Sequence, residues 1–178
     1  VFFFIFIIGI YGITHLKVEN SFVNYFKSDT EIYKGMKLID DKLGGTTPLE
    51  IIIQFNEIPD NDDDLLDFDF EYDQSDYWFT KEKMDVIKEV HDYIDSFTFT
   101  GKVLSLASVI RVAEELNADK EFDNLELSVI YKKLPQNLKS QILDPYLSID
   151  KNQARITVRL IDTNKELRRN EFLNEINS

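Results

Sequence analysis

The chain has 178 residues, a length typical of one domain, and its 33 acidic and 20 basic side chains give a formal net charge of −13. An acidic surface repels phosphate backbones, and no basic stripe offsets it, so we expect no nucleic-acid partner. A hydrophobic fraction of 43%, with 14 Phe and 8 Tyr, excludes a disordered chain and predicts a packed core. The chain has no cysteine, which excludes disulfides, thiolate catalysis and Cys-ligated zinc.

The chain begins with an uncharged apolar run from Val1 to Ile13. A helix of that length spans roughly 20 Å, less than the roughly 30 Å of bilayer hydrocarbon. A signal peptide would have a basic region before the run and a small-x-small cleavage site after it, and neither is present. The run also lacks the polar face of a core helix in a small soluble domain. We therefore expect residues 1–15 to be the C-terminal part of a transmembrane helix and residues 16–178 to form the following domain.

The first predicted helix of this domain follows a capping box, Ser28-x-x-Glu31. Its apolar residues at helical spacing are Ile32, Met36, Ile39 and Leu43. Gly44-Gly45 ends it. The near-continuous apolar run over residues 49–55 then predicts a strand that is buried on both faces.

A second helix over residues 81–97 and a short strand over residues 102–105 come next. The residues of that helix expected to face the core are Val86, Ile87, Val90, Tyr93, Ile94 and Phe97. Another amphipathic helix begins near Leu106, and Asp123-x-x-Glu126 has the spacing of a further capping box. These helices form a helical insertion before the next strand.

The C-terminal part of the chain predicts one more strand and one more helix. Polar and apolar residues alternate over 154–161, as in a strand with one buried face. The apolar face carries Ala154, Ile156, Val158 and Leu160. The capping box Thr163-x-x-Glu166 predicts a helix over residues 164–177.

This element order, β-α-β, then a helical insertion, then β-α, predicts an α+β fold with a split β-α-β unit of ferredoxin-like type. Helices would cover one face of the sheet, and the other face would meet water, another domain or a substrate. A final strand and helix usually belong to a β-α-β unit. We therefore expect a further strand beyond Ser178 and a chain that is part of a longer membrane protein.

An acidic insertion over about residues 57–79 is longer than an ordinary connection. It matches a calcium loop at the first, third, fifth and twelfth positions, through Asp60, Asp62, Asp64 and Glu71. However, Leu65 stands at the sixth position, where the sharp turn of a calcium loop needs glycine, and no helix obviously precedes Asp60. We therefore favour a solvated acidic insertion over a metal site, with these four acids as the calcium candidates.

Catalytic residues are not evident in the sequence. His91 borders an apolar helix face, where we expect a partly buried and hydrogen-bonded histidine. Ser105 and Ser108 lie at a helix start and lack the elbow motif of a nucleophilic serine. Phosphate-cradling glycine motifs are also missing. We therefore predict neither enzymatic activity nor a cofactor.

An aromatic cluster, Phe22, Tyr25 and Phe26, follows the apolar run. Two interpretations remain open. The rings either pack the linker onto the domain or line a path through which an apolar ligand leaves the bilayer.

Several segments match a known family in their order along the chain. They are the apolar run followed by residues 16–26, then 43–50, 102–108, 134–135, 143–148, and 154–159 through 167–169. This order resembles the first periplasmic loop of exporters of the RND superfamily, in the MMPL-like or hydrophobe/amphiphile branch. The resemblance covers nearly the whole chain except the acidic insertion; no single motif is as specific as a catalytic signature, and the shared order of the motifs carries the resemblance.

The resemblance implies a transporter of the bacterial inner membrane, with this segment facing the periplasm as a porter domain. It implies proton-driven export of lipids or other hydrophobic or amphiphilic compounds. The expected partners are the cargo, the membrane and the remaining domains of the transporter. A homo-oligomer is a further alternative, because the sequence does not determine the oligomeric state. In this family the proton-carrying acids lie in central membrane helices, so none is expected here. The alternative is a membrane-tethered extracytoplasmic module that binds a ligand or acts as a sensor or adaptor.

Overall fold

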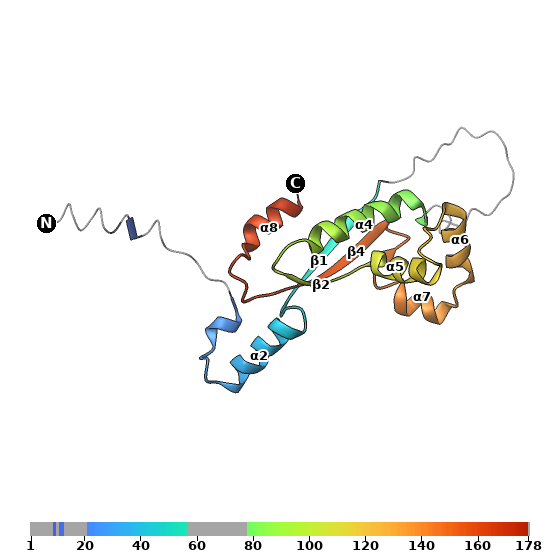
Figure 1. Cartoon of the computed structure of the whole chain (residues 1–178). Helices are drawn as coiled ribbons and strands as arrows, with labels where there is room; N and C mark the ends of the chain where they lie inside the picture. Colours follow the sequence, from blue (N-terminus) through green and yellow to red (C-terminus); the bar gives the residue numbers. More distant parts are fainter. Residues whose placement is uncertain (1–8, 10, 13–20, 57–77, 178) are drawn as a thin grey trace.

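The computed structural model describes residues 9, 11–12, 21–56 and 78–177 (Figure 1). Within these residues the chain is a mixed α+β fold with six α-helices and one antiparallel sheet, which confirms the predicted class. No helix in the described ranges is both long enough and apolar enough to cross a membrane. Most of the N-terminal apolar run and nearly all of the acidic insertion lie outside these ranges.

The elements in chain order are η1 (Val23–Tyr25), α2 (Glu31–Lys42), β1 (Thr47–Gln54), α4 (Lys81–Asp95), β2 (Thr100–Leu104), α5 (Leu106–Leu116), α6 (Asn124–Lys133), α7 (Gln136–Ile142), β3 (Leu147–Ser148), β4 (Gln153–Leu160) and α8 (Arg169–Ile176). In Figure 1, α2 lies at one end of the sheet, and α5, α6 and α7 gather at the other.

The central strand of the sheet is β4. The strand order is β1-β4-β2, with the short β3 also paired to β4. Both β1 and β2 run antiparallel to β4 and are therefore parallel to each other, connected through α4. This is the arrangement of a split β-α-β unit. The complete ferredoxin-like architecture has a further strand and remains a prediction, and β1 forms one edge of the described sheet.

One face of the sheet is covered by helices. The predicted alternation in β4 is confirmed, because Ala154, Ile156, Val158 and Leu160 are all buried. Ile94 of α4 and Phe172 of α8 pack against this face in one apolar cluster. The α4 face differs partly from the prediction, since Ile87 and Ile94 are buried whereas Val86 and Tyr93 are exposed.

The prediction that the first strand is buried on both faces is wrong. Along β1, half-buried and exposed residues alternate, and the Ile52 side chain is 48% exposed. On the same open face, β4 presents the exposed Arg155 and Arg159. Three consecutive isoleucines must point to alternate faces of a strand, so with helices on only one face the middle one meets solvent.

A second apolar cluster holds α5, α6 and α7 against the end of the sheet. Trp78, Phe79, Ile87, Leu106 and Leu127 are buried in this cluster. The predicted capping box at the start of α6 is confirmed, with both reciprocal hydrogen bonds present. The start of α5 is likewise capped by a serine side chain.

Two other predicted capping boxes are wrong. The N-cap of α2 is Thr30, whose hydroxyl accepts a hydrogen bond from the backbone N–H of Tyr33, and not Ser28. The last helix begins at Arg169 and not at residue 164, because Thr163 is held by a tertiary contact described below. In α2 a different residue, Thr30, provides the capping hydroxyl. In the C-terminal motif, Asp40 binds the N–H and the hydroxyl of Thr163.

Candidate functional site

Two aspartates are buried where β4 ends and α2 meets β1. Asp40 is fully buried and Asp162 is 4% exposed. Burying a carboxylate is costly unless hydrogen bonds and charges compensate for the lost water. The contacts of these two side chains therefore show what the local structure is built to hold together.

Asp40 lies in the last turn of α2 and accepts five hydrogen bonds. One carboxylate oxygen accepts from the Thr46 N–H (2.9 Å), the Thr46 hydroxyl (2.8 Å) and the Asp162 N–H (2.9 Å). The other accepts from the Thr163 N–H (2.9 Å) and its hydroxyl (2.7 Å). Burial alone raises the pKa of Asp40, but these hydrogen bonds outweigh burial and the pKa is lowered.

Asp162 binds the N-terminal segment. Its carboxylate accepts from the Ser21 hydroxyl (2.9 Å), the Val23 N–H (3.1 Å) and the Thr47 hydroxyl (3.1 Å). The Arg169 guanidinium donates to the same carboxylate from the start of α8. Val23 itself is fully buried, so this short segment is anchored by packing as well as by hydrogen bonds.

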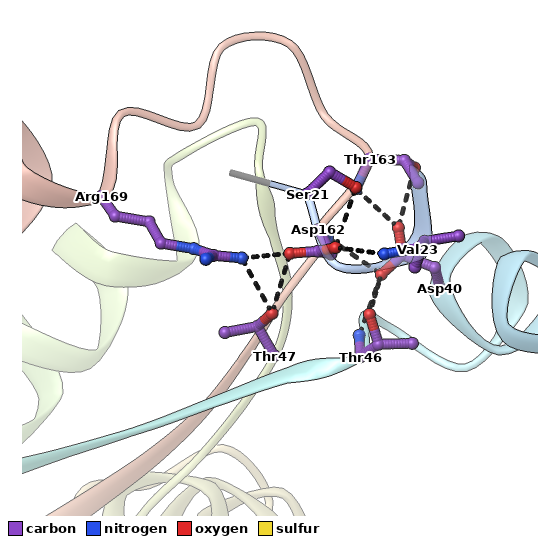
Figure 2. Close-up of polar contacts among 8 residues, drawn as sticks. All are labelled: Ser21, Val23, Asp40, Thr46, Thr47, Asp162, Thr163 and Arg169. Atoms are coloured by element: carbon purple, nitrogen blue, oxygen red, sulfur yellow. Dashed lines mark hydrogen bonds and ion pairs between the residues drawn. The ribbon is translucent and has the colours of Figure 1, made fainter. Parts of the chain in front are cut away.

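We call this network the carboxylate clasp; Figure 2 shows its eight residues, Ser21, Val23, Asp40, Thr46, Thr47, Asp162, Thr163 and Arg169. The clasp joins the segment before α2, the turn between α2 and β1, and the connection between β4 and α8. Its polar atoms point toward one another, so its role is to hold three chain segments together.

Glycines make the close approach at the clasp possible. Gly44 and Gly45, predicted to end the helix, have φ of +82° and +101°. A Cβ at Gly45 would lie 2.3 Å from the carbonyl oxygen of Leu160. A Cβ at Gly101 would lie equally close to the Gly44 carbonyl oxygen, at 2.3 Å. The turn therefore brings the backbone against the end of β4, where Asp40 can reach the two residues after Ile161.

The aromatic cluster lies next to the clasp. Phe22 packs edge to face against Tyr25 (6.2 Å between ring centroids) and Phe26 (5.5 Å). Phe22 and Tyr25 are 55% and 72% exposed, whereas Phe26 is half-buried. The structure thus brings the three predicted residues together, and their role as a substrate path remains a prediction. The residues that anchor this segment, Ser21 and Val23, were missed from the sequence.

The calcium candidates Asp60, Asp62, Asp64 and Glu71 lie outside the described residues. In the part of the chain that the structure describes, no group of three or more acidic or histidine side chains is arranged to hold a metal ion.

His91 is buried and hydrogen-bonded, as predicted. Its Nδ1 lies 2.8 Å from the Ser105 hydroxyl oxygen. The same oxygen accepts a hydrogen bond from the Ala107 N–H (3.1 Å) at the start of α5. Ser105 is fully buried and His91 only 6% exposed, so this pair joins α4 to α5 within the core. Burial and the nearby Arg111 lower the pKa of His91, and this effect exceeds the opposite effect of Asp92 and Asp95.

The lowered pKa of His91 predicts a pH-dependent stability. The contribution of His91 to the free energy of unfolding is fully present above the unfolded-state pKa of about 6.5. It is lost as the pH falls from there through the folded-state pKa, because His91 binds a proton more readily in the unfolded chain than in the folded one. We expect His91→Gln to make the free energy of unfolding depend less steeply on pH below pH 6.5. Urea unfolding at a series of pH values measures this dependence. An equally steep loss in the variant would contradict the assignment. His15, which borders the apolar run, lies outside the described residues.

Comparison of the chain with protein-family models, with curated proteins and with solved structures finds no match.

Proposed function

We propose that residues 16–178 are the first periplasmic porter domain of an RND-type, MMPL-like exporter in the bacterial inner membrane. In this proposal residues 1–15 end the first transmembrane helix, and the transporter moves lipids or other amphiphiles outward using the proton gradient. The observation that carries the proposal is the carboxylate clasp, because it fixes the chain just after the apolar run to the sheet. In this proposal the clasp would couple movements of the membrane helices to the sheet.

The clasp is suited to transmitting movement. Pulling Ser21 or Val23 away would remove hydrogen bonds from the buried Asp162 carboxylate, which still pairs with Arg169. Leaving a buried carboxylate short of partners costs about 1–3 kcal/mol for each lost group. A displacement of this segment therefore moves β4 and α8 with it, whereas a flexible tether would absorb the displacement.

An exposed apolar surface beside the clasp also supports the proposal. The large apolar side chains exposed there are Phe22, Tyr25, Ile32, Leu38, Ile39 and Leu43. They belong to η1, to α2 and to residues flanking these two helices, which contact each other. Ile32, Ile39 and Leu43 share one face of α2, and exposed apolar patches of this kind mark interaction sites. In an exporter this surface would contact other domains of the same protein or the bilayer surface.

The test is export by the full-length protein in liposomes, measured with a hydrophobic dye or a labelled lipid, with and without a proton gradient. We expect export to require the gradient, and Asp162→Asn to lower its rate by roughly tenfold. Ser21→Ala, which removes one hydroxyl bond, should have a smaller effect in the same direction. Asp41→Asn, an exposed neighbour of the clasp, is the matched control. Export that is indifferent to the gradient would reject the proposal.

A membrane-tethered binding module is the second candidate. An apolar cavity among α5, α6 and α7 favours it, because ligand sites are commonly concave and apolar. The gene sequence beyond Ser178 separates the two candidates. A further strand followed by several apolar runs of about 20 residues would support the exporter. A stop codon or a signalling domain would support the tethered module.

A further inference from the structure

The helical layer contains a cavity of about 140 Å³. It lies among α5, α6 and α7, and its lining, which is almost wholly apolar, includes Leu106, Ile110, Ala113, Leu127, Ile130 and Tyr131. An apolar cavity of about 150 Å³ in another protein stays dry and binds benzene. The cavity is therefore large enough for one ring or a short alkyl chain.

The cavity is accessible from solvent. Ile142 contributes to its lining and is itself exposed, while Ala113 and Ile130 are only half-buried. Further exposed apolar side chains on the same helices are Leu125, Val129 and Leu138. The cavity itself is partly open toward solvent, so a ligand can enter it from the surface.

A positive charge lies against one wall of the cavity. The Lys139 ammonium of α7 stands 3.9 Å from the centroid of the Tyr131 ring, and Tyr131 is a lining residue. Lys139 therefore puts a cation against the wall of an apolar cavity, in a chain whose net charge is −13. The combination complements a molecule with an apolar tail and an anionic head.

We propose that this cavity binds a small monoanionic amphiphile of the short fatty-acid class. Its alkyl chain would occupy the cavity, and its carboxylate would pair with Lys139 at the rim. The site goes beyond the proposed function, because it would serve an exporter or a tethered module equally well. Failure of binding would leave the porter-domain proposal intact, and failure of export would leave this site intact.

The chain carries its own reporter for the site. Trp78 is the single tryptophan, and its ring lies 5.1 Å from that of Phe79, a lining residue. A bromine atom in the cavity should therefore quench its fluorescence. The experiment titrates the full 178-residue chain, held in zwitterionic nanodiscs, with 6-bromohexanoate and with 6-bromohexanol. We expect saturable quenching by both, with the carboxylate bound roughly three- to tenfold more tightly.

Two variants separate the head group from the tail. Lys139→Gln should abolish the preference for the carboxylate. Lys37→Gln, which alters the lysine lying 5.9 Å from the Tyr33 ring on α2, is the matched control and should leave the preference unchanged. Ala113→Phe should fill the cavity and remove quenching by both compounds, and Ala113→Leu serves if the larger side chain prevents folding.

Three results would overturn the proposal. They are the absence of saturable quenching in the unaltered chain, equal affinity for the acid and the alcohol, and quenching that persists in a folded Ala113 variant. Circular dichroism of each variant shows whether it is folded, so a loss of quenching can be assigned to the cavity.

Discussion

Replacing Asp40 by Asn should lower the free energy of unfolding by about 3–5 kcal/mol. The carboxylate accepts five hydrogen bonds in a fully buried position, and an amide group would turn an NH₂ toward donors on Thr46, Asp162 or Thr163. Urea unfolding followed by circular dichroism measures the change. Asp41→Asn, on the exposed side of the same turn, should stay within about 0.5 kcal/mol of the unaltered chain.

The same variant should change the acid limb of the stability curve. The pKa of Asp40 is lowered below 3.8 in the folded chain. Its contribution is therefore complete above pH 3.8 and is lost as the pH falls through the folded-state pKa. Asp40→Asn should lose this dependence. A loss of less than about 1 kcal/mol at neutral pH would show that the clasp contributes little to folding.

Gly45→Ala should destabilise the chain by roughly 3 kcal/mol or more, measured by the same unfolding experiment. The added Cβ would lie 2.3 Å from the Leu160 carbonyl oxygen and 2.4 Å from its carbon, at a φ of +101°. Both contacts are with backbone atoms, so the steric clash can be removed only by moving the turn away from β4.

Gly35→Ala is the matched control for this substitution. Gly35 lies inside α2, and a Cβ there would meet nothing within 4 Å. Alanine in that position should stabilise the helix by about 0.5–1 kcal/mol. Similar effects at the two glycines would contradict the role assigned to the turn.

The predictions from sequence succeeded where neighbouring residues decide the structure. The alternation from Ala154 to Leu160 predicted the buried face of β4 correctly, because that face is set by the two-residue period of a strand. The capping box before α6 was also found, since both of its hydrogen bonds close within four residues. The aromatic cluster was predicted as a group because Phe22, Tyr25 and Phe26 are close in sequence.

Predictions failed where distant residues compete for the same groups. Thr163 has the spacing to cap a helix, yet its N–H and hydroxyl bind Asp40, 123 residues away. The apolar spacing in α2 predicted a helix but not its contacts, because Asp40 is its buried residue whereas Ile32 and Leu43 are exposed. Only the position of Asp162, directly after a buried strand, could have suggested a buried carboxylate.

The outer edge of β1 has a consequence for handling this chain. In the described sheet, β1 pairs with β4 along its whole length and borders no strand on its other side. Backbone donors and acceptors along that margin can recruit a foreign strand. Near one end Pro48 has no amide hydrogen to offer, and Glu50 adds a repulsive charge. These two residues protect only the first half of the margin, so at high concentration the chain should self-associate through the second half, and Ile52→Lys should keep it dispersed.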